Sequence, residues 1–200
     1  MRKAVVLGLG LLLALLGLVV IAQFLGPGLT TGGLSEYYKT GDDSGVSVYG
    51  IYWSAQTFTV GTTAHTVTSV KLKLYRVGSP GTVTVSIRAT SAGHPIGSDL
   101  TSGTIDGTSL NATEPGSWYR ITLTEYSLSA SAKYAVVIRA PSGNYTIPNP
   151  PEKPYANKLV WMADNTSPAY TGGNCEGSAD SGSTWSSYAD ADLMFEVWGR

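Results

Sequence analysis

The feature that most constrains the fold of this chain is an alternation of apolar and polar residues that recurs after residue 45. Residues 70–74 read Val-Lys-Leu-Lys-Leu, and residues 83–88 read Val-Thr-Val-Ser-Ile-Arg. A period of two places the apolar side chains of a strand on one face and the polar ones on the other. We therefore expect half-buried strands of antiparallel sheets. The turn residues Ser79-Pro80-Gly81 predict that these two strands form a hairpin.

The same pattern indicates further strands near residues 119–123, 134–138, 159–162 and 193–198. No segment after the N-terminal region has a convincing helical period. Short strands separated by Gly, Ser, Pro and Asn clusters favour two packed sheets over a βαβ fold. The sequence thus predicts an all-β fold, a jelly-roll-like antiparallel β-sandwich over residues 46–200.

A Pro-rich segment, residues 148–154, interrupts this pattern. Proline cannot donate a hydrogen bond to a central strand, so the segment is expected to form a stiff surface loop.

The N-terminus carries a second strong pattern. Arg2 and Lys3 precede 19 residues, 4–22, that are only Ala, Val, Leu, Ile or Gly. A basic tip before a long apolar run directs export and keeps the basic residues in the cytoplasm. We expect one N-terminal hydrophobic helix over residues 1–26, a signal anchor that contacts the membrane through residues 4–25.

Two points about this segment stay open. Its length suits a spanning helix, yet the small residue Ala22 also permits cleavage by a signal peptidase, and processing near Lys3 is a further alternative. Residues 27–45, rich in Gly, Ser and Thr, are expected to be a flexible spacer. The domain would then stand on the extracellular face of the membrane or on the cell surface.

Composition agrees with an exported binding domain. Only 14% of residues are charged and the formal net charge is −1, so no basic patch is expected to bind nucleic acid. The one cysteine, Cys175, has no partner in the chain for a disulfide. We expect a buried thiol, and a bridge to another chain is the alternative.

Near the C-terminus the sequence contains a pattern typical of a β-turn motif. Residues 178–185 match Ser-x-Asp-x-Gly-x-Thr-Trp, which resembles the Asp-box of sialidase-like proteins. In that motif the Ser and Asp side chains bind turn amides, Gly takes a positive φ and Trp packs beneath the turn. The resemblance implies a structural role for five residues: Ser178, Asp180, Gly182, Thr184 and Trp185.

The order of several segments resembles the exported β-sandwich domains called choice-of-anchor domains, in particular type R. The segments are residues 56–59, 70–74, 78–88 and 134–138, the Asp-box stretch, and residues 192–197. The resemblance implies a surface or secreted module without established catalytic residues. It differs in that the anchor candidate of this chain is N-terminal.

Aromatic residues are the best indication of binding. Alternation in residues 118–123 places Trp118 and Arg120 on the outer face of a strand, where a ring can stack on a ligand. Trp161, Tyr170 and Tyr188 occur near Gly-rich loops. Flat amphipathic rings suit the apolar faces of sugars as well as protein surfaces, so these five residues are the candidate ligand-binding set.

Metal binding and catalysis have less support. Four acids near the two ends of the domain, Asp42, Asp43, Asp190 and Asp192, are candidates for structural calcium, and no other cofactor is expected. His65 and His94 have turn-like neighbours, so exposed loop positions are expected. No nucleophile motif or selected carboxylate pair indicates an enzyme.

These observations predict a non-enzymatic, membrane-anchored surface module for adhesion or carbohydrate binding. Its partners would be the membrane and a glycan or cell-surface protein. The alternative is a subunit of an extracellular pilus-like filament, self-associating through N-terminal helices in the filament core.

Overall fold

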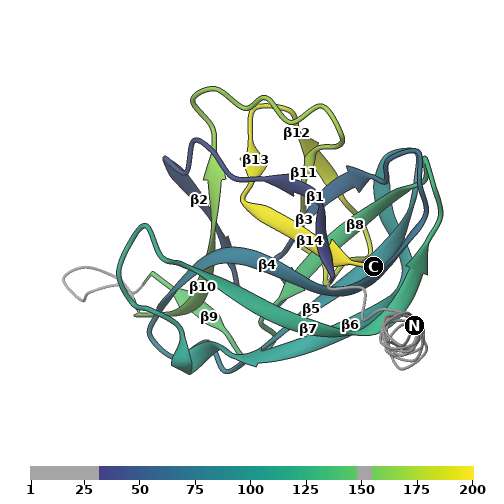
Figure 1. The fold of residues 1–200 in the computed structure, drawn as a ribbon. Coiled ribbons are helices and arrows are strands. Elements are labelled where there is room, and N and C mark those ends of the chain that lie inside the picture. Colours follow the sequence, from purple (N-terminus) through teal and green to yellow (C-terminus); the bar gives the residue numbers. More distant parts are fainter. Residues whose placement is uncertain (1–31, 148–154) are drawn as a thin grey trace, which may run out of the picture. The chain divides into compact units, whose positions relative to one another are not determined.

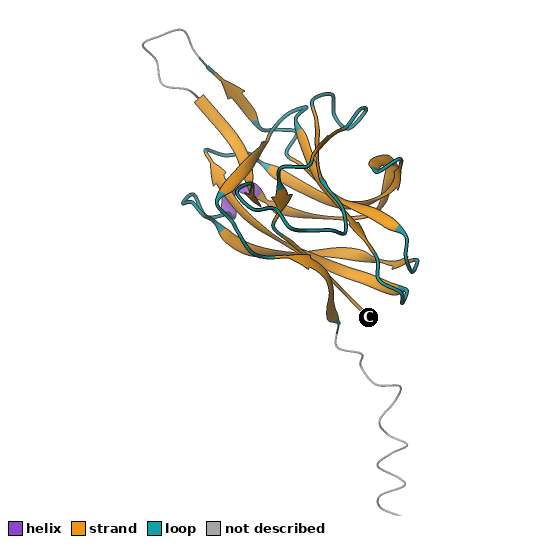
Figure 2. Cartoon of the chain, turned by 90° about the horizontal axis from the view of Figure 1, so that it is seen from above, coloured by secondary structure: helices purple, strands orange, loops and turns teal. Residues whose placement is uncertain are grey.

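Two antiparallel sheets, packed on each other in a β-sandwich-like arrangement, make up the structure (Figure 1). It is a computed structural model that describes residues 32–147 and 155–200. Within those residues it contains fourteen strands and a short 3-10 helix, Gly107–Ser109, and no α-helix (Figure 2). The predicted all-β fold is thereby confirmed.

Sheet I has eight strands. Five of them follow one another in the order β1 (Gly33–Tyr38), β14 (Phe195–Gly199), β4 (His65–Val77), β10 (Tyr155–Asp164) and β13 (Asp192–Leu193). The other three pair alongside: β2 (Ser44–Val48) and β9 (Asn144–Thr146) with β10, and β7 (Ser117–Leu128) with β4. Because β1 pairs with β14 with Gly33 opposite Gly199, the two ends of the described chain lie side by side.

Sheet II has six strands. Their order is β12 (Ser186–Tyr188), β11 (Cys175–Ser178), β3 (Trp53–Thr59), β8 (Lys133–Arg139), β5 (Thr82–Ser91) and β6 (His94–Asp106).

The main core lies between the sheets and follows from the alternation. Leu72 and Leu74 of β4 and Val85 and Ile87 of β5 are fully buried, whereas the intervening Lys71 and Lys73 lie on the outer side, half-buried. Burying one such aliphatic side chain stabilises the fold by about 1.5–3 kcal/mol relative to leaving it exposed.

The predicted hairpin around Ser79-Pro80-Gly81 is wrong. β4 pairs with β7, β10 and β14, while β5 pairs with β6 and β8, so this connection crosses from sheet I to sheet II. Gly78 and Gly81 take positive φ values of 65° and 75°, which L side chains rarely adopt. The two strands bury their apolar faces against one core from opposite sides, which produces the same sequence pattern as a hairpin.

The boundary predicted between spacer and domain also needs correction. β1 and the start of β2 fall inside residues 27–45, and the compact unit begins at Gly32. Side-chain contacts tie this segment to the fold: His65 Nε2 lies 3.0 Å from a carboxylate oxygen of Glu36, and Asp42 forms an ion pair with Lys73.

Two predictions fall outside the described residues: the N-terminal helix over 1–26 and the Pro-rich loop over 148–154. In the part of the chain that the structure describes, no helix is long and apolar enough to span a membrane.

Candidate functional site

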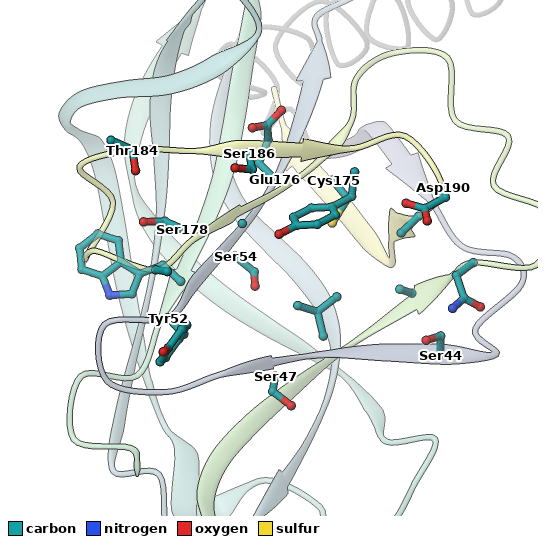
Figure 3. Close-up of a pocket in the computed structure, with 18 residues that line it drawn as sticks. Ser44, Ser47, Tyr52, Ser54, Cys175, Glu176, Ser178, Thr184, Ser186 and Asp190 are labelled. Carbon is teal, nitrogen blue, oxygen red and sulfur yellow. The ribbon is translucent and has the colours of Figure 1, made fainter. Parts of the chain in front are cut away.

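A groove opens where the inner faces of the two sheets part. Its volume is about 480 Å³, which is within the range of small-molecule sites. β2 and β10 contribute one wall and β3, β11 and β12 the other (Figure 3). Asp190 and Ser44 lie near one end, and Tyr52 and Thr184 near the other. The lining residues are Ser44, Val46, Ser47, Tyr52, Trp53, Ser54, Ala163, Asn165, Cys175, Glu176, Gly177, Ser178, Ala179, Thr184, Ser186, Tyr188, Asp190 and Ala191.

Small residues at inward positions create this space. Ser54 of β3 pairs with Gly177 of β11, which pairs with Ser186 of β12, so three small residues lie in one row across sheet II. Ala163 and Ser44 form a similar pair in sheet I. Side chains therefore do not fill the space between the two sheets at the groove. The space is also shaped by Gly177: a Cβ there would lie 2.9 Å from the ring of Tyr188.

The groove combines aromatic rings with hydroxyl side chains. Tyr188 is 50% exposed and Tyr52 is 44% exposed. Ser44, Ser54 and Ser186 add hydroxyl side chains to its lining, Ser186 at an exposed position and Ser54 at a buried one. These groups can donate and accept hydrogen bonds beside a ring that covers apolar surface.

The groove carries little charge, and what it has is acidic. No Lys, Arg or His is among its described lining residues, and Asp190 is exposed. Glu176 contributes to the lining, but its carboxylate is fully buried and accepts a hydrogen bond from Ser187 and lies 2.8 Å from His94 Nδ1. His94 therefore contacts a buried acid, and His65 contacts Glu36, so neither is the free loop histidine that the sequence suggested.

The prediction of a buried thiol is confirmed. Cys175 is almost inaccessible, and burial, with the nearby Glu176 charge, raises its pKa to about 12. A protonated thiol in such surroundings is a poor nucleophile.

The turn at residues 178–185 closes the Thr184 end of the groove. Asp180 accepts hydrogen bonds from the backbone amides of Ser183 and Thr184, and Ser178 Oγ accepts one from the amide of Gly182 at 2.8 Å. The hydrogen bonds from Thr184 lower the pKa of Asp180 to about 2. The Trp185 indole donates to the Gly182 carbonyl at 3.2 Å. These are the contacts that the Asp-box pattern implied.

Trp185 has a packing role here. With Trp53 it covers a small buried cluster on the outer side of sheet II, formed by Ala55, Ala135 and Val137.

The five aromatic and cationic candidates do not form one site. Only Tyr188 lines the groove. The prediction for Trp161 is wrong, because its ring is completely buried and its indole donates to the Met194 carbonyl at 2.8 Å. Tyr170 packs edge-on against Phe195, with ring centroids 5.3 Å apart, and burial strongly raises its pKa.

Trp118 and Arg120 belong to the outer side of sheet I. Trp118 is half-buried opposite Lys73. The Arg120 guanidinium lies 4.8 Å from the Trp198 ring centroid and donates to Ser69. Trp198, which the sequence analysis did not select, is a second ring on this face, and the side chains of Arg120 and Lys71 lie over it.

The carboxylates of the four calcium candidates lie in different places and make different contacts. Asp42 pairs with Lys73, Asp43 accepts from the backbone amide of Asn165, and Asp192 accepts from that of Tyr170. Asp190 lines the groove. Within the described ranges no three His, Cys, Asp or Glu residues are grouped as a metal site requires.

Sequence reasoning missed Tyr52 and the row of small residues. The run Tyr-Gly-Ile-Tyr-Trp at residues 49–53 is a visible signal, because three aromatics flank a turn-forming glycine. The small residues give no signal, since Ser and Gly are common throughout the chain.

Comparisons with known proteins add no assignment. No protein-family model matches the chain, and no curated protein sequence matches it. The resemblance to choice-of-anchor domains therefore stays a prediction.

Proposed function

We propose that this protein is a non-enzymatic surface module that binds carbohydrate in the groove between its sheets. The observation that carries the proposal is the presence of two exposed tyrosine rings, Tyr52 and Tyr188, in one groove with the hydroxyl side chains of Ser44, Ser54 and Ser186. A sugar has apolar C–H faces and a rim of hydroxyls, so it needs both kinds of group. No basic residue lines the groove in the described part of the chain, which favours an uncharged sugar.

A binding role is favoured over hydrolysis by the state of the acids. Glycoside hydrolysis needs two carboxylates facing the bond that is cleaved. Asp190 is in the groove, whereas the carboxylate of Glu176 is held by His94 and Ser187. Turnover of a soluble sugar that depends on Asp190 would contradict this part of the proposal.

The setting of the module is also a proposal. The basic tip and apolar run of residues 1–26 support export and attachment to the outer face of the membrane. We further propose that the sandwich is of the jelly-roll class. Sedimentation of the native protein as a polymer would favour the filament alternative.

The test is a glycan-array screen of the full-length chain in detergent micelles, followed by calorimetry on the sugars that bind. Replacing Tyr188 with Ala is expected to weaken binding about twofold to tenfold, because aromatic stacking contributes about 0.5–1.5 kcal/mol. Tyr37→Ala is the matched control, since Tyr37 is also 50% exposed but belongs to β1. Equal affinities for the Tyr188→Ala and Tyr37→Ala variants would refute binding in the groove.

A further inference from the structure

We propose that the ligand is a linear carbohydrate chain, which leaves the groove past Tyr52 and continues over Tyr145 on the β9–β10 arm. This inference rests on the proposed function and specifies its ligand. The arm is β9 together with residues 155–158 of β10. The subsite on it lies outside the groove.

A row of tyrosine rings connects the groove to the arm. Tyr52, which lines the groove, has its ring centroid 4.8 Å from that of Tyr49, and Tyr49 lies 5.9 Å from Tyr145. Tyr52 and Tyr145 are thus separated by a single ring. Tyr145 is 39% exposed, so it can still stack on a ligand.

Backbone contacts hold the row in place. Tyr49 and Tyr52 form a bridge with two backbone hydrogen bonds of 3.1 and 2.8 Å. The turn between them is attached to the base of the arm, because the Gly50 amide donates to the Ala140 carbonyl at 2.9 Å. The rings need little ordering when a ligand binds, which lowers the entropic cost of binding.

Lys158 fixes the far end of the row. Its Nζ lies 5.3 Å from the Tyr145 ring centroid and donates to Ser47 Oγ at 2.8 Å. Ser47 itself lines the groove. An ammonium group beside the ring provides further hydrogen-bond donors for sugar hydroxyls. Ser47 alternates with the inward-facing Val46 and Val48, so its contact with Lys158 lies on the outer side of sheet I, at the rim of the groove (Figure 3).

Register places these groups on one face of the arm. Tyr145 pairs with Ala156, and alternation brings Lys158 to the same side. Tyr155, which is 62% exposed, pairs with Thr146 and lies on the opposite face. The arm extends away from the body of the sandwich (Figure 2). A single sugar in the groove could not reach Tyr145, whereas a chain could contact Tyr188, Tyr52 and Tyr145 in succession.

The test measures how affinity depends on chain length. The full-length protein in detergent micelles is titrated with linear β-1,4-linked glucose, xylose and N-acetylglucosamine oligomers of one to six units. Affinity is expected to rise with length for at least one series. Tyr145→Ala should abolish most of this rise, with a loss of about threefold to tenfold for the hexamer and no change for the shortest oligomer that binds.

Two control variants separate the aromatic contact from other effects. Tyr145→Phe keeps the ring and should retain the affinity for the hexamer. Tyr155→Ala removes a more exposed ring from the opposite face and should bind like the unaltered protein.

The contrary outcomes are distinguishable. If Tyr188→Ala weakens binding but Tyr145→Ala binds the hexamer normally, the groove is the site and the arm is not, which overturns this inference alone. If no oligomer binds, or Tyr188→Ala has no effect, the proposed function and the inference both fall.

Discussion

Tyr38 in β1 donates a hydrogen bond of 2.6 Å to the carboxylate of Asp164 at the end of β10, across 126 residues of sequence. Both side chains are buried, and the Tyr38 oxygen also accepts a hydrogen bond from the Ala169 amide at 3.2 Å. Burial, reinforced by the bond to Asp164, raises the pKa of Tyr38. This contact attaches the first strand to the rest of sheet I.

Replacing Tyr38 with Phe should lower the free energy of unfolding by about 1–3 kcal/mol, because a buried carboxylate oxygen loses its donor. Urea denaturation of the full-length chain in detergent measures it. Tyr37→Phe, at the exposed neighbouring position, should change stability by less than about 0.5 kcal/mol. Equal stability of the two variants would mean that β1 is not held through this bond.

Asp192 predicts a dependence of stability on pH. Burial raises its pKa above the usual value near 3.8, and the charge of Asp164, its cross-strand neighbour, acts in the same direction. The folded state then binds the proton more tightly than the unfolded state, so this residue's contribution is most favourable at low pH and falls as pH rises through the raised pKa.

Asp192→Asn is therefore expected to be more stable than the unaltered protein at pH 7, since the amide oxygen can still accept from the Tyr170 amide. The difference should shrink as pH falls through the pKa of Asp192. Melting temperatures between pH 3 and pH 8 test this. A difference that does not vary with pH would exclude titration of Asp192 as its cause.

Cys175 should resist thiol reagents in the folded protein. Its side chain is buried and its pKa is raised to about 12, so the reactive thiolate is scarce at neutral pH. Labelling with a disulfide exchange reagent at pH 8 should be slow, and it should become fast in denaturant. Rapid labelling without denaturant would show that the strands around Cys175 open readily.

The strands of the core were predictable because apolar alternation reports one buried face. β7, β8 and β10 contain the segments expected from sequence. Alternation does not report which sheet a strand joins, and the β4–β5 connection was misassigned for that reason. Both strands contribute leucine, valine or isoleucine to the same core, whether they pair with each other or face each other across it.

β1 was missed for a different reason. Its register shifts between Leu34 and Tyr37, so Leu34 lies opposite Trp198 whereas Tyr38 lies opposite the core residue Phe195. The half-buried Glu36 within this irregular stretch interrupts the apolar pattern further. The carboxylate is accommodated because His65 lies within hydrogen-bond distance. That compensation comes from a residue 29 positions away, so local sequence cannot indicate it.

The candidate site was the least predictable part. Of the five residues selected for ligand binding, Tyr188 reached the groove, whereas Trp161 became the largest buried side chain of the core. An aromatic residue near Gly-rich loops can face either way. The groove exists because small side chains leave space between the sheets. A sequence pattern of Ser and Gly does not indicate where such a space forms.

The pairing of β1 with β14 has a consequence for how such a domain can be held. Gly33 lies opposite Gly199 on the neighbouring strand, so the two ends of the domain lie side by side in sheet I. An attachment at either end would hold the domain at the same place and present the groove and the arm in the same orientation. For this fold, the orientation of the domain relative to its attachment does not depend on which terminus is attached.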